Sequence, residues 1–383
     1  MESDARSILA WLQSQQAEMV AFLSDLARDE SPSDVPDSQK SVFGLLADAL
    51  SDLGFRVRLL RGKSSGGQLY ASPLLRRRGQ PRQLLIGHCD TVWPTGTLGE
   101  MPVEENEGKL KGPGVYDMKA GLTQIVFALR ALRRQGRAPG VTPLIFINSD
   151  EEIGSEDSLQ RIINLARVAC RAFVMEPSLG IGGQLKTARK GVGQYTVHIR
   201  GKAAHAGLDP QAGASAILEL SHVIQTLFGL NDIQRGTTVN VGVIDGGIRP
   251  NVVAPVSRAQ VDVRVLTGEE AQRIDGAIRG LQPQTPNVSL QISGGINRPP
   301  MERTPGNQQL WEMARELGSD LGVELQQGTA GGASDGNFTS LYIPTLDGLG
   351  AVGDGAHASH EFVFVEKLPE RTALLSLLLL APA

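Results

Sequence analysis

Acidic and imidazole side chains follow several apolar stretches of the sequence, each at the point where an expected strand ends. The segment QLLIGHCDTV places His88 and Asp90 after one apolar run. LIFINSDEE places Glu151 and Glu152 after a second run, and AFVMEPS places Glu176 after a third. In an open α/β sheet, groups beyond the carboxyl ends of the strands converge on one crevice, where ligands bind. These side chains are therefore expected to be neighbours in space although they are far apart in sequence.

Two loops add groups of the same kind. KGPGVYDMKAG sets Asp117 at the start of an expected helix, and GLGAVGDGAHASHEFV offers two histidines, His357 and His360. Carboxylates at the end of a core strand cost stability unless a positive charge lies among them. A mixture of imidazole and carboxylate ligands suits a divalent metal of the zinc type. Two cations bridged by one carboxylate, Asp117, would explain why so many acids lie together.

The chemistry expected of such a centre is amide hydrolysis. Zinc lowers the pKa of bound water to roughly 7 and polarises a carbonyl group. Consecutive residues point in different directions, so one member of the pair Glu151–Glu152 can bind metal while the other acts as general base. His88 and Asp90 are two residues apart on the same side of an extended segment. Asp90 can therefore accept the proton of the imidazole nitrogen that does not bind metal.

Apolar strands alternating with amphipathic helices must position these groups. Strands are expected at 55–60, 69–74, 84–87, 144–148 and 172–175. Helices are expected as one N-terminal helix through residues 8–26, then at 41–53, after Asp117 and near 158–166. This alternation predicts an α/β fold with a mostly parallel sheet flanked by helices on both faces.

The pattern changes between residues 184 and 293. There the expected order is strand, helix, strand, strand, helix, strand, which is typical of a split-βαβ, ferredoxin-like sandwich. Such a unit is large enough to stand alone. We therefore expect an inserted domain at 184–293 and an outer domain formed by 1–183 and 294–383.

Composition narrows the classes of function. The chain has 383 residues, of which 41% are apolar and 20% charged, and its net charge of -4 comes with scattered Lys and Arg. The sequence lacks the clustered stripe of basic residues that would indicate nucleic-acid binding. Cys89 and Cys170 are the only cysteines, which excludes a disulfide framework and favours a reducing compartment. The polar N-terminus differs from a signal peptide, and the run LLSLLLL is too short to span a bilayer. These features predict a cytoplasmic protein without a membrane partner.

The motifs GHCDTV, GPGVYDMKAG, SDEEIGS, MEPS and the C-terminal His–Glu loop, in this order, resemble a known family. It is the co-catalytic zinc metallopeptidase family of glutamate carboxypeptidase, aminoacylase, acetylornithine deacetylase and succinyl-diaminopimelate desuccinylase. The resemblance covers essentially the whole chain and implies a zinc exopeptidase-like fold. It implies two Zn²⁺ per subunit, with Co²⁺ or Mn²⁺ as alternatives. The metal ligands it implies are His88, Glu152, Glu176, one C-terminal histidine and a bridging Asp117.

The same resemblance implies further roles around the metals. Glu151 would be the general base, and Asp90 would be the partner of His88. Family members usually place the C-terminal ligand four or five residues before the glutamate that here is Glu361, which selects His357 over His360. The peptide bond after Asp117 is often cis in this family.

Segments of the inserted domain also resemble the family. GKAAHAG carries His205, which would reach the active site, often that of the partner subunit, and stabilise the oxyanion. Because this domain normally acts as lid and dimerisation domain, a homodimer is expected. Three further segments, TVNVGVIDGGIRPNVVAP, GGINRPPME and GTAGGASDGNF, suggest substrate contacts from Asn240, Arg298 and the Gly331–Gly332 backbone. An arginine with glycine amides suits a carboxylate.

Glu176 and the GGASD and NRPP segments resemble the glutamate carboxypeptidase branch, since aminopeptidase-like members tend to use Asp at the position of Glu176. The expected function is zinc-dependent cleavage of a peptide or amide bond next to a free carboxylate. One alternative is an aminoacylase or deacetylase that acts on N-acyl amino acids. Another, from a different class, is a ligand-binding relative without catalysis.

Several residues near the motifs have simpler interpretations. Cys89 lies between His88 and Asp90, but strand alternation turns it away from them and predicts a packed thiol. GPGVYDMKAG lacks the Gly-Lys-Ser/Thr ending of a phosphate loop. Glu156 and Asp157 are expected at the start of a helix, where acidic side chains suit the dipole.

Overall fold

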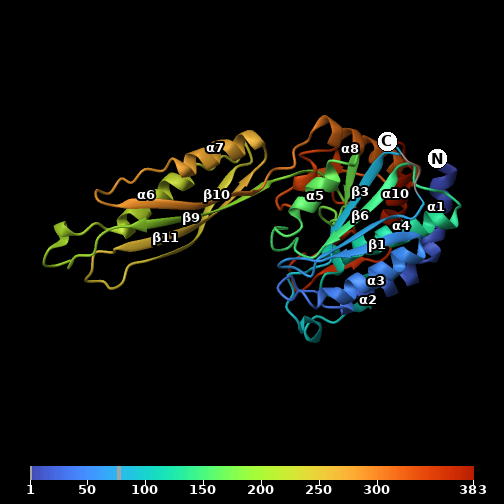
Figure 1. Cartoon of the computed structure of the whole chain (residues 1–383), viewed down its shortest axis with the longest axis horizontal. Coiled ribbons are helices and arrows are strands. Elements are labelled where there is room, and N and C mark those ends of the chain that lie inside the picture. The colour runs from blue at the N-terminus through green and yellow to red at the C-terminus, as the bar shows by residue number, and fades with distance from the viewer. Residues whose placement is uncertain (1, 76–78) are drawn as a thin grey trace. The chain divides into compact units, whose positions relative to one another are not determined.

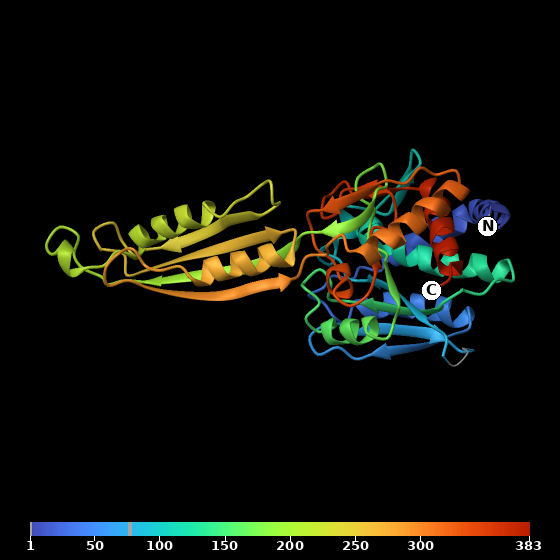
Figure 2. The ribbon, with the colours of Figure 1, turned by 90° about the horizontal axis from the view of Figure 1, so that it is seen from above.

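The computed structural model describes residues 2–75 and 79–383 and divides the chain into two compact units (Figure 1). Unit 1 comprises Met1–Thr187, Arg303–Thr329 and Ser334–Ala383. Unit 2 comprises Ala188–Glu302 and Ala330–Ala333. The chain therefore leaves unit 1 a few residues later than the sequence pattern suggests, and it returns at Arg303 rather than at 294. Both termini lie in unit 1 (Figure 2).

A six-stranded sheet forms the centre of unit 1. Its order is β1 (Phe55–Leu60), β2 (Gln68–Pro73), β6 (Thr142–Asn148), β3 (Arg82–His88), β7 (Arg171–Val174) and β14 (Thr345–Leu346). The four strands from β6 to β14 are parallel, whereas β1 and β2 are antiparallel to their neighbours. The predicted mostly parallel sheet is confirmed. Its parallel strands bring their carboxyl ends to one edge, as the candidate site requires.

Helices cover both faces of this sheet (Figures 1 and 2). Alternate side chains such as Leu85, Ile145 and Phe173 belong to the larger apolar core. The helices of that core are α1 (Glu2–Ser14), α2 (Gln16–Arg28), α3 (Gln39–Asp52), α4 (Ala120–Arg134), α8 (Pro305–Asp320) and α10 (Lys367–Leu380). The intervening side chains, such as Leu84 and Phe146, pack instead against α5 (Leu159–Ala166) and α9 (Gly336–Thr339). Because both faces are covered there, the central strands β3, β6 and β7 are buried along almost their whole length, whereas the edge strand β1 is partly exposed.

The N-terminal region contains two helices, so the prediction of a single helix through residues 8–26 is wrong. α1 ends at Ser14 and α2 begins at Gln16, with Gln15 in a turn at φ −100° and ψ 4°. The buried apolar positions skip from Leu12 to Met19, and the intervening QSQQAE is almost entirely polar. No apolar stripe therefore holds a continuous helix against the core there.

The C-terminal run LLSLLLL forms the end of α10, as predicted for a packed helix. Residues Leu374, Leu375 and Leu377 are buried in the core of unit 1. Among the described residues, none of the helices combines the length and the apolar character needed to cross a membrane.

Short strands that the sequence pattern did not predict join the C-terminal loop to the rest of unit 1. β4 (Glu104–Asn106), β5 (Lys109–Lys111), β16 (Phe362–Phe364) and β15 (Gly353–Asp354) form a four-stranded sheet. β16 pairs with β5 in the register Phe362↔Lys111. This pairing holds the segment that carries both C-terminal histidines close to the glycine-rich turn that follows β5. A two-stranded sheet is formed by β8 (Leu185–Arg189) and β13 (Gln327–Ala330).

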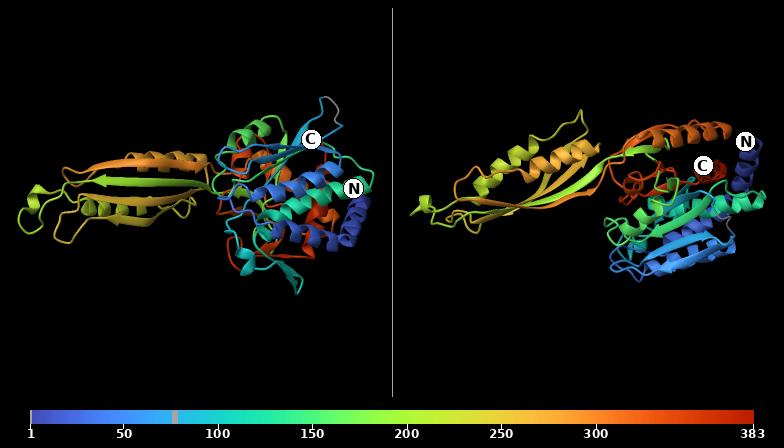
Figure 3. Two further views of the ribbon diagram at one scale, coloured as in Figure 1. Left: turned by 60° about the horizontal axis from the view of Figure 1, so that its bottom comes forward. Right: turned by 45° about the horizontal axis from the view of Figure 1, so that its top comes forward.

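Unit 2 has the predicted split-βαβ order. It runs β9 (Gly191–Arg200), α6 (Ala216–Phe228), β10 (Thr238–Gly246), β11 (Val256–Val265), α7 (Gly268–Arg279) and β12 (Ser289–Arg298). The strands form an antiparallel sheet in the order β10-β11-β9-β12. Both helices lie on one face of this sheet (Figure 3). Inward-facing residues of β9, such as Tyr195, Val197 and Ile199, form the core with them.

An ion-pair network ties the start of α7 to the segment before β10. The Glu270 carboxylate accepts hydrogen bonds from Arg273 (2.7 Å), Arg235 (2.9 Å) and Thr237 (2.8 Å). Arg273 above all, with Arg235 and Thr237, lowers the pKa of Glu270 to about 2. Because this folded-state pKa lies below the ordinary value of 4.5, the network stabilises unit 2 above about pH 4.5. Its contribution is lost as the pH falls towards 2.

We therefore expect Glu270→Gln to lower the midpoint of thermal unfolding by a few degrees at pH 7. The difference from the wild type should shrink as the pH is lowered from 5 to about 2. Thermal unfolding followed by circular dichroism over this range checks the expectation. Glu269→Gln, at the exposed neighbouring position, is the control. A difference that stays constant down to pH 2 would contradict the account.

Candidate metal centre

The side chains predicted to bind metal lie together in unit 1, beyond the carboxyl ends of β3, β6 and β7. His88 is the last residue of β3, and Glu176 follows β7 by two residues. Glu151 and Glu152 occupy the turn after β6. The remaining two candidates come from loops: Asp117 lies in the turn Val115–Lys119 that precedes α4, and His357 lies between β15 and β16.

The two histidines contact different carboxylates. His88 Nε2 lies 3.3 Å from Glu176 Oε1 and 3.4 Å from Asp117 Oδ1. His357 Nε2 lies 3.1 Å from Glu152 Oε2 and 3.6 Å from Asp117 Oδ2. The two oxygens of Asp117 therefore face two different imidazoles, each of which also has its own terminal carboxylate.

The chemistry of this donor set fits divalent metal ions. Ligand atoms of His88, Glu151 and Glu176 lie within 4.8 Å of one another, and so do those of His88, Asp117 and Glu152. His88 Nε2 and Asp117 Oδ1 are buried and have no hydrogen-bond partner. A buried nitrogen lone pair and a buried carboxylate oxygen are costly without a partner. A bound cation would supply that partner to both atoms.

Charges within the cluster shift its pKa values. Burial alone would lower the pKa of His88, but its contacts with Asp117, Asp90 and Glu176 hold that pKa well above the usual value. The hydrogen bond with Glu152 raises the pKa of His357 to about 9. Burial raises the pKa of Glu152. A raised pKa means that each of these groups holds a proton more readily. That proton offsets the negative charge of the surrounding carboxylates, as a bound metal ion would.

Asp90 connects His88 to the acidic turn. His88 Nδ1 lies 3.0 Å from the backbone carbonyl oxygen of Asp90 and 3.4 Å from its Oδ1. A carbonyl oxygen only accepts, so Nδ1 carries the proton in the neutral ring, which leaves Nε2 as the nitrogen that can bind metal. The Asp90 carboxylate also accepts from Ser33 Oγ (2.7 Å) and from the amides of Glu151 (3.3 Å) and Glu152 (3.2 Å). Asp90 therefore orients the imidazole and the acid pair together.

The turn that presents Asp117 has an unusual backbone. The peptide bond between Asp117 and Met118 is cis, as the family resemblance implies. Gly114, at φ +72°, is left-handed, and a Cβ there would lie 2.6 Å from Thr91 Cγ2. Only glycine fits this position without displacing the neighbouring strand end.

The buried Glu361 carboxylate also holds the turn at Asp117. It accepts the amide N–H groups of Gly114, Tyr116 and Asp117 and the indole N–H of Trp93. Burial raises the pKa of Glu361 to about 7, whereas its four N–H donors favour the ionised form. This role of Glu361 does not follow from the sequence, because nothing in the segment ASHEF indicates contacts with residues 244 or more positions away.

His357 and His360 occupy different environments. Both residues are exposed, but the His357 ring contacts Glu152 and Asp117. His357 has φ 61°, a left-handed conformation that is uncommon for residues other than glycine. Such a conformation at a functional loop often serves to aim the side chain. The geometry favours His357 as the C-terminal ligand.

The remaining candidates all belong to unit 2. His205 lies in an exposed loop, and its Nδ1 accepts the amides of Gly207 (3.1 Å) and Leu208 (3.2 Å). Asn240 is exposed on the outer strand β10, and Arg298 is buried at the end of β12.

The glycine pair of the GGASD segment is exposed. Arg189 holds it in place by donating to the carbonyl oxygens of Gly332 and Ala333, each at 3.2 Å. No Cβ added at Gly331 or Gly332 would meet another atom within 4 Å. The space beside this backbone is therefore open.

Asp150 and Asp157, on either side of Glu151 and Glu152 in the sequence, hold neighbouring backbone in place. Helix α5 begins at Leu159, and the Asp150 carboxylate accepts the amides of Asp157 (2.8 Å) and Ser158 (3.1 Å) just before it. Asp157 does not lie in the helix. Its carboxylate accepts the amides of residues 63–65 and the hydroxyl of Ser65 (2.7 Å). The prediction for Asp157 is wrong because its carboxylate has a long-range partner.

Cys89 is fully buried, in agreement with the prediction of a packed thiol. Burial raises the pKa of this thiol. The thiol form that results is a poor metal ligand.

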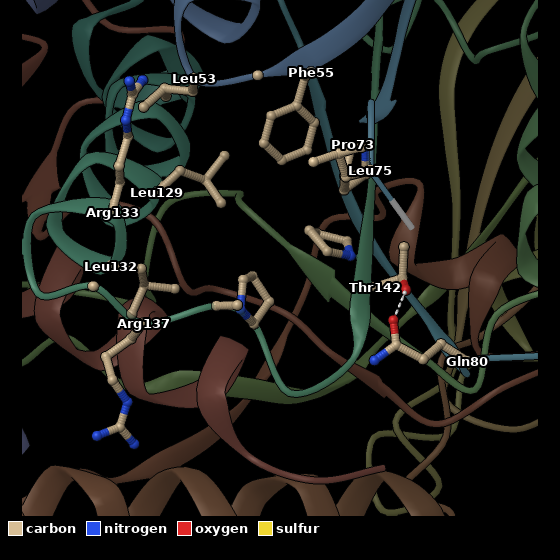
Figure 4. A pocket seen from close by; sticks show the side chains of 15 residues that line it. Leu53, Phe55, Pro73, Leu75, Gln80, Leu129, Leu132, Arg133, Arg137 and Thr142 are labelled. Atoms are coloured by element: carbon tan, nitrogen blue, oxygen red, sulfur yellow. Dashed lines mark hydrogen bonds between the residues drawn. The ribbon is translucent and has the colours of Figure 1, made fainter. Parts of the chain in front are cut away.

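One cavity of unit 1 lies away from the candidate metal ligands. It measures about 830 Å³ and lies near the start of β6 and the ends of α3 and α4, lined by residues such as Phe55, Leu129 and Thr142 (Figure 4). None of the candidate ligands lines it. Its two arginines are already bound: Arg133 donates to Asp52 O and Arg137 pairs with Asp4 at 3.1 Å.

The fold and the site together define a metal-dependent peptidase or amidohydrolase: a mostly parallel sheet with an inserted split-βαβ unit, and imidazole and carboxylate groups gathered beyond the strand ends. Peptidase family M20/M25/M40 matches residues 84–381, and the chain belongs to this family. The family resemblance inferred from the sequence motifs is confirmed.

Three known proteins illustrate the similarity. Carboxypeptidase G2 of Pseudomonas sp. (strain RS-16) is 27% identical over 379 residues, which cover 96% of this chain and 89% of that protein. Succinyl-diaminopimelate desuccinylase of Gluconacetobacter diazotrophicus is 28% identical over 367 residues, which cover 90% and 92%. The crystal structure of aminopeptidase PepT from Bacillus cereus superimposes with a TM-score of 0.79 at 22% identity and covers 95% of this chain and 98% of that one. The structural likeness supports the fold alone.

Proposed function

We propose that this protein is a zinc-dependent hydrolase that cleaves a peptide or amide bond next to a free carboxylate. The observation that carries the proposal is the position of Asp117, whose Oδ1 and Oδ2 lie 3.4 Å and 3.6 Å from the Nε2 atoms of His88 and His357. A carboxylate aimed at two imidazoles in this way suits a bridge between two metal ions.

The contacts support a division of the ligands between the two ions. His88 and Glu176 would hold one zinc ion, His357 and Glu152 would hold the other, and Asp117 would be shared. Co²⁺ or Mn²⁺ could occupy the same donor set. Bound zinc would supply an activated water and a polarised substrate carbonyl.

Glu151 would then move the proton. As general base it would take a proton from the attacking water, and as general acid it would pass the proton to the leaving amine. Its backbone amide is held by Asp90 Oδ1, and its neighbour Glu152 is held by Oδ2 of the same carboxylate. The two acids are thereby fixed relative to each other, which suits one ligand and one base.

His205 would stabilise the oxyanion. Because its Nδ1 accepts two backbone amides, a neutral ring carries its proton on Nε2. That N–H could donate to the oxygen on which negative charge develops. Arg298, Asn240 and the amides of Gly331 and Gly332 would bind the substrate carboxylate and its surroundings.

We also propose an oligomeric state and a cellular compartment for the enzyme. Unit 2 would serve as a lid and form a homodimer. Its outer strand β10 carries Val243 and Ile244 with 52% and 56% of their surfaces exposed, and an exposed apolar edge suits pairing with a second copy. The unpaired cysteines Cys89 and Cys170 agree with a reducing, cytoplasmic compartment.

A second function is favoured by the comparison with known proteins. The desuccinylase is 28% identical to this chain over 367 residues, and the carboxypeptidase is 27% identical over 379 residues. Hydrolysis of N-acyl amino acids by an aminoacylase or deacetylase is therefore the alternative. Both reactions use the same centre and differ in what lies on either side of the scissile amide.

A substrate panel separates these functions. Zinc-, cobalt- and manganese-loaded protein would be assayed with a peptide ending in glutamate, the same peptide with an amidated C-terminus, and a set of N-acetyl amino acids. We expect cleavage of the free acid and little or no cleavage of the amidated peptide. Equal rates on both peptides would contradict recognition of a carboxylate. Faster cleavage of the N-acetyl amino acids would favour the alternative.

A further inference from the structure

The Glu361 carboxylate accepts hydrogen bonds from four N–H donors, and the residue is only 1% exposed. Oε2 accepts the indole N–H of Trp93 at 2.8 Å and the amide of Gly114 at 3.0 Å. Oε1 accepts the amides of Tyr116 at 2.9 Å and Asp117 at 3.1 Å. The side chain therefore binds three amides of the turn that carries Asp117, including the amide of Asp117 itself.

The backbone around Glu361 connects it with the loop of His357. The Glu361 amide donates to Ala358 O at 2.9 Å, and the Ala358 amide donates to Gly355 O at 2.8 Å. Gly355 is left-handed at φ +86°, and a Cβ there would lie 2.8 Å from the Cα of Glu361. This compact loop links the position of His357 to that of the Glu361 side chain.

We propose that Glu361 is a positioning residue of the metal centre, which holds the Asp117 turn and the His357 loop in register so that both side chains reach the same metal ion. This inference rests on the proposed function, because that function assigns Asp117 and His357 to one ion. Glu361 contacts the backbone of Asp117 and of Ala358, the residue after His357, rather than the donor atoms of the ligands. It therefore acts on metal binding through Asp117 and His357.

The hydrogen-bond pattern explains why this position needs a carboxylate. Two oxygens each accept two N–H donors, and an ionised carboxylate has about four such acceptor sites. Glutamine has the same shape but only one acceptor oxygen. Its NH₂ group would face two N–H donors, so two of the four hydrogen bonds would be lost and the donors left buried without partners.

The test compares Glu361→Gln with Glu366→Gln, an exposed glutamate five residues further along the chain. Zinc alone is titrated into metal-free protein in the presence of a competing chromophoric chelator. We expect Glu361→Gln to bind zinc about 10- to 100-fold more weakly than the wild type, because the loss of a contact that supports a metal ligand typically lowers metal affinity by this factor. Glu366→Gln should match the wild type. Zinc binding by Glu361→Gln as tight as that of the control would overturn the proposal.

Steady-state kinetics at saturating zinc give a second readout. Because Glu361 does not touch the substrate in this account, kcat should fall while KM stays unchanged. A rise in KM with unchanged kcat would place Glu361 in substrate binding instead and overturn the positioning role.

Hydrogen–deuterium exchange of the metal-free wild type keeps the inference testable if Glu361→Gln does not fold or if the wild type binds no zinc. Peptides that cover residues 112–119 should show slow exchange at the amides of Gly114, Tyr116 and Asp117. Exchange there as fast as in an unstructured peptide would overturn the inference. Failure of the wild type to bind zinc would instead contradict the proposed function, so the two failures are distinguishable.

Discussion

Replacing Glu151 with Gln is expected to lower kcat by about 10²- to 10⁴-fold and to leave the amount of bound zinc unchanged. Glutamine preserves the shape of the side chain and can accept a hydrogen bond, but it cannot take a proton from water. The measurement combines steady-state kinetics with metal analysis of the same zinc-loaded sample.

The metal analysis is essential because Glu151 lies near enough to bind metal. Its ligand atom is within 4.8 Å of those of His88 and Glu176, so geometry alone would also allow it to be a ligand. A variant that loses zinc together with activity would make Glu151 a ligand, and a variant that keeps its activity would remove it from catalysis. Glu156→Gln, at the exposed acid five residues on, is the matched control and should behave as the wild type.

His357→Ala is expected to remove one zinc ion per chain and to lower kcat/KM by more than about 100-fold. The imidazole lies 3.1 Å from Glu152 and 3.6 Å from Asp117, so its loss leaves one ion with carboxylate ligands alone. Loss of a supporting contact typically costs 10- to 100-fold in metal affinity or activity, and loss of the ligand itself should cost more.

His360→Ala provides the control within the same loop. His360 is exposed and should be replaceable without change in zinc content or activity. Metal analysis and kinetics of the two alanine variants, prepared side by side, check this. If His360→Ala loses zinc while His357→Ala retains it, the loop must rearrange around the metal and the present ligand assignment is incorrect.

Much of the candidate centre follows from local sequence patterns. His88, Glu151 and Glu176 each lie at or just beyond the end of a short apolar run that predicts a buried strand, and parallel strands bring such positions to one edge. The split-βαβ order of unit 2 is likewise predictable, because β9 and β11 bury alternate residues along their length.

Other features depend on partners that are distant in the sequence. Asp157 binds the loop at residues 63–65, and Glu361 binds the turn at Asp117, across separations of more than 90 and 240 residues. No spacing rule connects such pairs. The break between α1 and α2 at Gln15 is hard to predict for a different reason. The apolar positions on both sides of it keep helical spacing, and only the lack of packing by the polar residues between them marks the break.

The roles of Asp150 and Ser33 also do not follow from the sequence pattern. The Asp150 carboxylate accepts the amides of Asp157 and Ser158 just before α5, and burial raises its pKa to about 6. Ser33 donates to Asp90 across 57 positions. A serine in the segment ESPSDVP has many alternative roles in turns, so its type carries no signal of this contact.

The most direct test of the account is the activity of the protein as a function of bound metal. Metal-free protein, prepared with a chelator, would be titrated with zinc while turnover of the best substrate and bound zinc are measured together. We predict no turnover without metal and a rise in activity that levels off at two zinc ions per chain. Full turnover by the metal-free protein, or no turnover on any amide substrate with both ions bound, would contradict this prediction.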